Sequence, residues 1–556
     1  MAVIKRGIGF TPTERNLAAL ADKIFLNLWT YPNLFKGDGK ELCDLLVVCG
    51  DDVLIFSDKN IAWPKGDDFG LSWSRWYRRA IEVSAAQING ATRCLREYPD
   101  ELFLDAARKE KFPLALPPLD RRRLHHIAVA LGASEACADH YKKAPGYFPV
   151  APDLKGKSHT DTAVEGFMPF AIGDVQVEGA FIHVFNEPAL ELLARELDTV
   201  TDFARYLTRR ERIMRSGHLL PLAGEHDLLG QYLLSGGPDE EHDFTRPGGG
   251  EWQKGEKFQI PDGTYAGLTA QPGYKARKEA DKVSYTWDNL LGQFTASILA
   301  GEAEGAFGNE PKPAEAEEGL RSMALEPRLR RRLLGASVVD AMKKAEAAKA
   351  DRFARHMVPG AHSVDETVGY VLLILAHHGE APGDAYTEYR KRRMAMLQGY
   401  GLNMLRDNRA LKRAIGIGID VSSKVTGRKG GSEDFYALEV DAWTPELEKR
   451  AQELKEDFDL LKPDNVTHAT ASVDEFPRTR EDGGLAPELQ SQLQTVQSVT
   501  AGSTVANIKA EPAVVNVKPD AKWPNMWRVH LPNGQVSDMT NLTQARDAAQ
   551  SFSRSG

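Results

Sequence analysis

A chain of 556 residues is long enough for several domains with buried cores, and 42% hydrophobic and 27% charged residues are ordinary proportions for a globular protein. The net charge of −9 argues against a protein that coats nucleic acid through its overall electrostatic field. A local basic groove that binds nucleic acid is still compatible with this charge. Four cysteines without a CxxC pair exclude a disulfide scaffold and give no zinc signature. Because the N-terminus has no apolar signal core and no run of about 18 apolar residues occurs, we expect a cytoplasmic chain without a membrane span.

Residues 11–28 are expected to form the first helix. Thr11 suits the N-cap, Pro12 the first helical position, and Glu14 the third position of a capping box. Two roles for Glu14 remain open. It could serve the cap alone, or it could also reach a site along the buried face, because the apolar residues begin one helical turn later.

A loop is expected at residues 30–40, and a β-hairpin at 41–59, where two apolar runs flank a polar turn. Both strands are apolar on both faces, which is typical of a sheet covered on its two sides. Yet Asp44 interrupts the first strand, and Asp58 and Lys59 close the second. Such charges are costly when buried unless they pair or bind a metal. The hairpin therefore ends in either a structural ion pair or a metal-dependent site.

The pattern after the hairpin completes an N-terminal unit, residues 1–216. A long helix at about 72–97 carries Gln87 on a face that is otherwise apolar or small, so Gln87 is either a satisfied core amide or a site residue. His125 and His126 are adjacent in a predicted strand and point to opposite faces, so they cannot easily bind one metal. The remaining elements expected in this unit are strands at 124–131 and 180–185 and helices at 188–197 and 201–214.

The rest of the chain divides by composition into four parts. The pattern predicts a mixed helical and insertion region at residues 217–324 and a second α/β domain at 325–462. Residues 463–520 are polar and read as a flexible linker. Residues 521–556 read as a ββα mini-domain, because Pro532-Asn533-Gly534 is a strong hairpin signal.

The N-terminal order of residues resembles the PD-(D/E)xK, or restriction-endonuclease-like, nuclease superfamily. That order is Glu14 on a helix, Asp44 on one strand, Ser57-Asp58-Lys59 on the next strand, and Gln87 on the following helix. The resemblance implies an α/β fold with a mixed sheet flanked by helices. The complete prediction is this restriction-endonuclease-like unit, a second α/β domain and a small ββα C-terminal unit.

Position 57 departs from the family pattern, which has an acid two residues before the lysine. Asp58 is adjacent but would point to the other face of a regular strand. Three outcomes are open. A bulge could turn Asp58 inward, Ser57 could replace the carboxylate while Glu14 supplies the charge, or the site could be inactive. We favour the second outcome, because Glu14 lies on the buried face of its helix.

The resemblance implies a Mg²⁺- or Mn²⁺-dependent nuclease, acting on DNA and serving bacterial phage defence. Its metal would be held by Asp44, Glu14 and Asp58, and its catalytic group would comprise Lys59, Asp44, Glu14, Gln87 and Ser57. The alternative is a catalytically degenerate nuclease fold that binds nucleic acid or serves as a scaffold subunit. A second copy of the chain, or another protein, could also bind through the C-terminal regions.

Residues 370–462 resemble a domain of uncharacterised bacterial proteins that carry the same N-terminal hairpin, and this resemblance implies no chemistry. Asp420, Glu439 and Asp441 imitate a second carboxylate set. No lysine follows at the family spacing, so we interpret them as structural or interaction residues.

Overall fold

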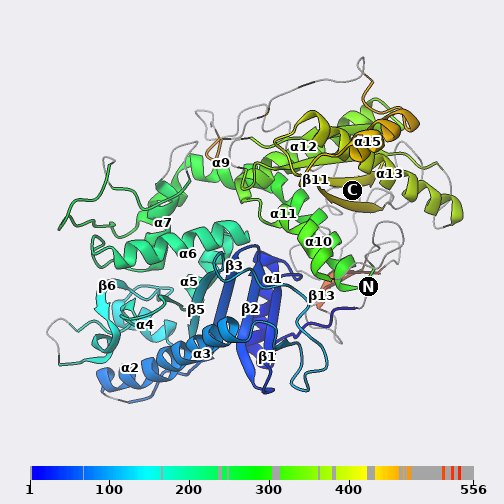
Figure 1. Ribbon diagram of the computed structural model, residues 1–556. Helices are drawn as coiled ribbons and strands as arrows, with labels where there is room; N and C mark the ends of the chain where they lie inside the picture. The colour runs from blue at the N-terminus through cyan, green and yellow to red at the C-terminus, as the bar shows by residue number, and fades with distance from the viewer. Residues whose placement is uncertain are drawn as a thin grey trace. The chain divides into compact units, whose positions relative to one another are not determined.

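The computed structural model describes most of the chain up to residue 462 and short stretches beyond it (Figure 1). It divides the chain into two compact units, which are described separately. Unit 1 comprises residues 1–275 and 295–328, and unit 2 comprises 276–294 and 329–556. The described ranges are 3–66, 68–163, 167–235, 241–246, 250–302, 313–360, 363–378, 383–421, 432–462, 468, 471, 474–477, 516–519, 527–530 and 536–539.

Unit 1 is built on a six-stranded mixed sheet with the strand order β4-β1-β2-β3-β5-β8. The pairs β4–β1, β1–β2 and β2–β3 are antiparallel, whereas the pairs β3–β5 and β5–β8 are parallel. The α/β expectation is therefore confirmed, with a mixed sheet flanked by helices. The strands are β1 Thr30–Lys36, β2 Glu41–Cys49, β3 Asp52–Asn60, β4 Leu102–Phe103, β5 Arg123–Leu131 and β8 Ile182–Phe185.

Helices α1 (Pro12–Phe25) and α3 (Val83–Glu97) cover opposite faces of this sheet. The Phe56 ring faces α1, with its centroid 6.3 Å from that of Phe25. The next residue of β3, Ser57, points the other way and contacts Ser84 and Gln87 of α3. Successive side chains of β3 therefore contact different helices, because neighbouring residues of a pleated strand point to opposite faces of the sheet.

Two predicted elements of this region differ from the structure. The predicted loop at 30–40 contains strand β1, which pairs with β2 although Pro32 lies within it. The predicted helix at 72–97 is divided by a π-helical turn, Arg78–Glu82, between α2 (Phe69–Tyr77) and α3. Single π-turns often occur at functional sites, and this one lies one turn before Gln87.

The predicted boundary at residue 216 does not separate compact units, because most of 217–324 belongs to unit 1. Within this region, Glu317 of α11 (Pro313–Ala324) is buried and accepts a 2.5 Å hydrogen bond from Trp29 Nε1. The remaining α-helices and strands between residues 134 and 299 are α4 Ser134–Tyr141, β6 Val150–Lys155, β7 Ile172–Asp174, α5 Glu187–Glu196, α6 Val200–Arg215, α7 Glu225–Leu234, α8 Thr264–Ala270, α9 Pro272–Ala280 and α10 Tyr285–Leu299. Residues 276–294 of α9 and α10 belong to unit 2.

Unit 2 contains a four-stranded sheet with the order β12-β11-β10-β9. Strands β10 and β11 are parallel and are joined through the long helix α13, whereas the two outer strands are antiparallel to them. This unit is therefore of the α/β type, and β9 is a strand that the sequence did not reveal. The elements are α12 Arg328–Ala347, β9 Arg352–Met357, β10 Val368–Leu375, α13 Asp384–Asp407, β11 Arg413–Asp420, β12 Glu433–Glu439 and α15 Pro445–Asp457.

Three short strands form an antiparallel sheet near the C-terminus: β13 (Asn516–Pro519), β14 (Trp527–His530) and β15 (Val536–Met539). The pairing of β14 with β15 agrees with the predicted hairpin. Strand β13 lies within the predicted linker 463–520, which is a correction to that boundary. The helix expected after residue 541 lies outside the described residues.

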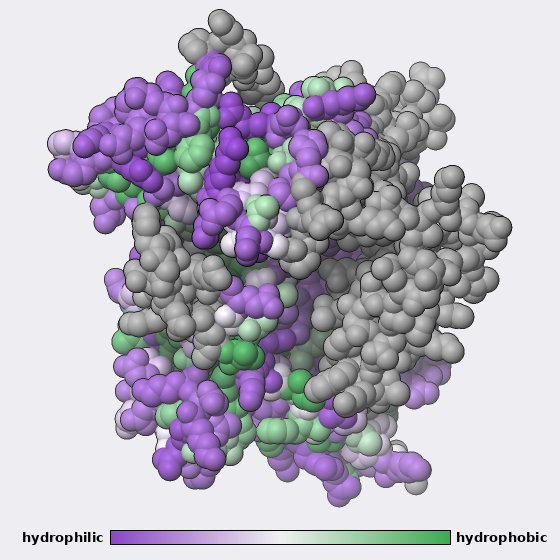
Figure 2. Space-filling model, turned by 90° about the vertical axis from the view of Figure 1, so that its right-hand side faces the viewer, coloured by the Kyte–Doolittle hydropathy of each residue, from purple (hydrophilic) through white to green (hydrophobic). Residues whose placement is uncertain are grey.

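Within the described ranges, none of the helices combines the length and apolarity needed to span a membrane. On the face drawn in Figure 2, the hydrophobic residues among those placed occur in small groups between hydrophilic ones. All four cysteines are free and buried, as expected for reduced core thiols.

Candidate functional site

Asp44 lies where the antiparallel ladder of β2 and β3 stops. The ladder pairs run from Cys49–Asp52 to Leu45–Phe56, so Asp44 and Ser57 follow the last pair. Instead of a ladder bond, the backbone N–H of Asp58 donates to Asp44 Oδ2 at 2.5 Å. The end of the pairing thus leaves the Asp44 carboxylate at the point where the two strands separate.

Lys59 and Gln87 both donate to the Asp44 carboxylate. Lys59 Nζ lies 3.2 Å from Asp44 Oδ2, and Gln87 Nε2 lies 3.2 Å from Oδ1. Ser57 Oγ donates to Gln87 Oε1 at 2.9 Å, which turns the amide nitrogen towards Asp44. The structure therefore brings four of the predicted site residues into one hydrogen-bonded group on the α3 side of the sheet.

Ser57 does not substitute for a metal-binding carboxylate in this arrangement. Its side chain is fully buried, and its hydroxyl is engaged by Gln87 and lies 3.2 Å from Ser84 Oγ. The other expected route, a bulge that turns Asp58 inward, is also absent, since β3 pairs with β5 without a shift from Asp52 to Asn60. Ser57 is a positioning residue for Gln87.

Glu14 lies on the opposite side, at the N-terminus of α1, and performs its capping role. Its backbone N–H donates to the Thr11 hydroxyl at 3.2 Å, and its carboxylate accepts the Phe10 N–H at 2.9 Å. Asn33 Nδ2 also donates to Glu14 Oε2 at 2.8 Å. Burial alone would raise the pKa of Glu14, but these hydrogen bonds hold it below its usual value.

Asn33 and Glu41 are site residues that sequence reasoning missed. Asn33 Nδ2 donates to Glu41 Oε1 at 2.7 Å as well as to Glu14, so one amide joins two carboxylates. Burial raises the pKa of Glu41, and the charges of Asp44 and Glu14 raise it further. The available signal was an acid at the start of an apolar strand. Asn33 itself lay in the predicted loop and has a left-handed backbone, with φ of 53°.

Asp58 is a buried carboxylate without a hydrogen bond of ordinary geometry. It is 6% exposed, and neither of its side-chain oxygens has a partner. Burial raises its pKa to about 6, and the charges of Asp44 and Glu14 add to this effect, while Thr13 and Lys59 oppose it. Asp58 therefore faces α1, away from the group around Gln87. The charge of Asp44 in that group nevertheless acts on the Asp58 carboxylate.

Asp58→Asn is expected to stabilise the protein at pH 8 by on the order of 2 kcal/mol. Since the folded pKa lies above the ordinary value of 3.8, the folded state retains a proton between about pH 4 and 6 that the unfolded state has lost. Wild-type stability should therefore fall as pH rises through this window, and the advantage of the Asn variant should vanish at pH 4. Urea unfolding at pH 4, 6 and 8 measures the difference.

The exposed Asp100→Asn serves as the control for this prediction. It removes a carboxyl group from an exposed position of the same unit. The pH profile of unfolding should therefore stay like that of wild type. A profile for Asp58→Asn that runs parallel to wild type over the whole range would show that Asp58 carries no raised pKa.

The predicted metal ligands do not converge on one point. Among the described residues, the group whose ligand atoms all lie within 4.8 Å of one another is His226, Asp227 and Asp262, and the set Glu14, Asp44 and Asp58 is not such a group. Asp44 forms its contacts on the α3 side, whereas Glu14 and Asp58 lie towards α1. The expectation of a three-carboxylate metal site is corrected to two neighbouring sets of acids.

The two carboxylates beside His226 already bind donors of the protein. Asp227 accepts the backbone N–H groups of Gly263 and Tyr265 at 3.1 and 3.0 Å, which ties α7 to the start of α8. Asp262 pairs with Lys143. This cluster joins local elements of unit 1 and is separate in sequence from the hairpin.

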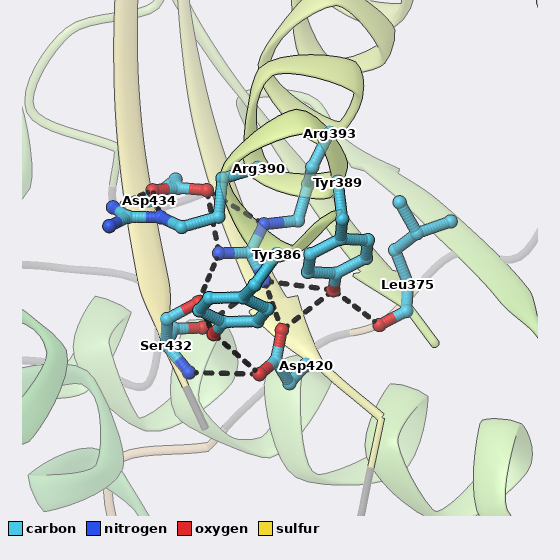
Figure 3. Close-up of polar contacts among 8 residues, drawn as sticks. All are labelled: Leu375, Tyr386, Tyr389, Arg390, Arg393, Asp420, Ser432 and Asp434. Carbon is cyan, nitrogen blue, oxygen red and sulfur yellow. Dashed lines mark hydrogen bonds and ion pairs between the residues drawn. The ribbon is translucent and has the colours of Figure 1, made fainter. Parts of the chain in front are cut away.

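Unit 2 holds a buried ionic network around Arg393 of α13 (Figure 3). The side chain of Arg393 is 0% exposed and lies 2.6 Å from both Asp420 Oδ1 and Asp434 Oδ2. It also donates to the Ser432 hydroxyl at 2.7 Å, and Tyr389 OH donates to Asp420 Oδ1 at 2.6 Å. Asp420 is therefore a structural ligand of an arginine, as interpreted from the sequence. Glu439 likewise pairs with Arg413.

Comparison of the chain with protein-family models, with curated proteins and with solved structures gave no match.

Proposed function

We propose that the protein is a divalent-metal-dependent phosphodiesterase that cleaves DNA. The observation that carries the proposal is the Asp44 carboxylate, held by Lys59 and Gln87 beside the acids Glu41 and Asp58. The carboxylates outnumber the lysine, so the site carries an excess of negative charge. A divalent cation would compensate this excess.

Mg²⁺ or Mn²⁺ suits this set of donors. Such ions prefer oxygen ligands, and Mg²⁺ typically binds one or two carboxylates and completes its coordination with water and substrate phosphate. Asp44, whose carboxylate lies where β2 and β3 separate, would hold the ion. When bound, the ion supplies positive charge to a phosphoryl oxygen and lowers the pKa of a water molecule.

The protein's own groups have distinct tasks in this proposal. Lys59 would place its ammonium group against the non-bridging phosphate oxygens, where charge develops during hydrolysis. Gln87 would hold Asp44 in orientation through its amide, and Ser57 would fix that amide. Glu14 and Glu41, joined by Asn33, would set the negative potential that favours the cation.

Incubation of the full chain with plasmid and linear DNA tests the proposal. We expect cleavage with Mg²⁺ or Mn²⁺ and none with EDTA, because hydrolysis depends on the bound cation. Cleavage that continues in EDTA, or an absence of cleavage with either metal, would contradict a metal-dependent nuclease. A role in defence against foreign DNA would be consistent with the first result.

A second candidate is a nucleic-acid-binding protein that has lost catalysis. It is favoured by the buried Ser57 and by the engagement of both Asp44 oxygens with protein donors. This candidate predicts salt-sensitive DNA binding without hydrolysis under any divalent metal. Cleavage that requires Asp44 would remove it.

A further inference from the structure

Phe10 is an aromatic residue that is exposed to solvent and yet firmly placed. Its side chain is 65% exposed and leans on Phe35, with ring centroids 6.3 Å apart. An exposed phenylalanine costs hydration free energy unless something covers it. A ligand that covered the ring would recover this free energy.

The backbone around Phe10 is held at four points. The Phe10 N–H donates to Glu14 Oε2 at 2.9 Å, and Arg15 Nη1 donates to the Phe10 carbonyl at 2.8 Å. Gly9 has φ of +90°, and an added Cβ would lie 2.6 Å from the Arg15 nitrogen. An added Cβ on Gly7 would lie 2.4 Å from the Pro32 carbonyl oxygen. These contacts fix the backbone from which the ring projects.

The backbone of Phe10 contacts an acid of the candidate site, Glu14, and a cation, Arg15. The residue that accepts the Phe10 N–H, Glu14, shares Asn33 with Glu41. Arg15 uses its guanidinium group on the backbone carbonyls of Gly9 and Phe10 and forms no ion pair with any described residue. An exposed ring whose own carbonyl is bound by an arginine without an acidic partner offers a group for each part of a nucleotide, the base and the phosphate.

We propose that Phe10 stacks on an unpaired base of single-stranded DNA, while Arg15 contacts the adjoining phosphate. The inference rests on the proposed function and names its substrate class. Stacking on the ring requires a base that is free of its partner strand, because both faces of a base in a duplex are covered by neighbouring pairs. The site would therefore act on single strands, or on duplex ends and junctions that expose them.

Binding measured by fluorescence anisotropy tests this inference in the full-length Asp44→Asn background, so that cleavage does not interfere. The probes are a single-stranded oligothymidine, an abasic strand of the same length, and a duplex. Phe10→Ala should weaken oligothymidine binding about tenfold, which is the effect expected from losing one stacked base. It should leave the abasic strand and the duplex unchanged, and Phe10→Trp should restore binding.

Tyr98→Ala is the matched control, because Tyr98 is also an exposed aromatic residue of unit 1, at 54%. It should leave all three affinities unchanged. Arg15→Gln should weaken both oligothymidine and the abasic strand and reduce the salt dependence of both. An equal loss for thymidine and abasic strands in Phe10→Ala, or no loss at all, would overturn the stacking role.

These outcomes separate the inference from the proposed function. Wild-type cleavage of DNA with Mg²⁺, combined with an unchanged affinity in Phe10→Ala, would retain the nuclease and reject the stacking site. Absence of cleavage in wild type would reject the nuclease, whatever the effect of Phe10→Ala on the affinity for DNA.

Discussion

Replacement of Asp44 by Asn is expected to lower Mg²⁺-dependent DNA cleavage by about 10²- to 10³-fold, the loss typical of removing one electrostatic contact to a transition state. The substitution retains the size of the side chain and its hydrogen bond from the Asp58 N–H, but it removes the charge that pairs with Lys59 and would hold the cation. Lys59→Met should cause a loss of similar size, because it removes the ammonium group from the same point. Initial rates on linear DNA measure both.

Asp51→Asn is the control for both variants. Asp51 lies in the turn of the same hairpin and pairs with Arg121 at 3.3 Å on the surface, so its replacement should leave cleavage within about twofold of wild type. Thermal unfolding of all three variants distinguishes lost chemistry from lost folding. Full activity in both Asp44→Asn and Lys59→Met would place the catalytic site elsewhere.

Replacement of Arg393 by Leu is expected to destabilise unit 2 by about 3–5 kcal/mol, because it removes the buried cation that pairs with both Asp420 and Asp434, and Asp434 keeps only the half-exposed Arg390. Asp420 and Asp434 each lie 2.6 Å from the guanidinium group, and the arginine is fully buried. The network joins α13 to β11 and β12, so these elements should open together. Hydrogen exchange measured by mass spectrometry on peptides from the two strands reports this loss.

Arg392→Leu provides the comparison, since Arg392 is exposed on the same helix. It should change exchange in β11 and β12 little. The triple variant Arg393→Leu, Asp420→Leu and Asp434→Leu should recover part of the lost stability, because no unpaired charge remains in the interior. If Arg393→Leu exchanges as slowly as wild type, the network contributes no net stability.

Much of the N-terminal unit follows from local patterns in the sequence. The Thr11-Pro12 cap, the hairpin around Gly50 and the polar Gln87 on an apolar face each appear in the structure where the pattern placed them. These predictions succeed because capping, strand alternation and helical periodicity act over a few residues.

The parts that could not be predicted depend on contacts between distant residues. Strand β1 contains Pro32, which argues locally against a strand, yet β2 and β4 pair with it on either side. Asn33 becomes a bridge between Glu14 and Glu41 only after β1 is placed. Likewise, the role of Ser57 follows from the position of the Gln87 amide, which no local pattern specifies.

The π-helical turn at Arg78–Glu82 makes the spacing between two helices a determinant of the site. On its N-terminal side, Trp73 and Trp76 anchor α2 through hydrogen bonds to the carbonyls of His159 and Ile61. On its C-terminal side, Gln87 is anchored on the sheet. Because its hydrogen bonds run from residue i to i+5, a π-helical turn takes in one residue more than an α-helical turn. The extra residue lets α2 keep its tryptophan anchors while Gln87 of α3 still meets Asp44, so the alignment of the two helices is a property of the whole segment and not of either helix alone.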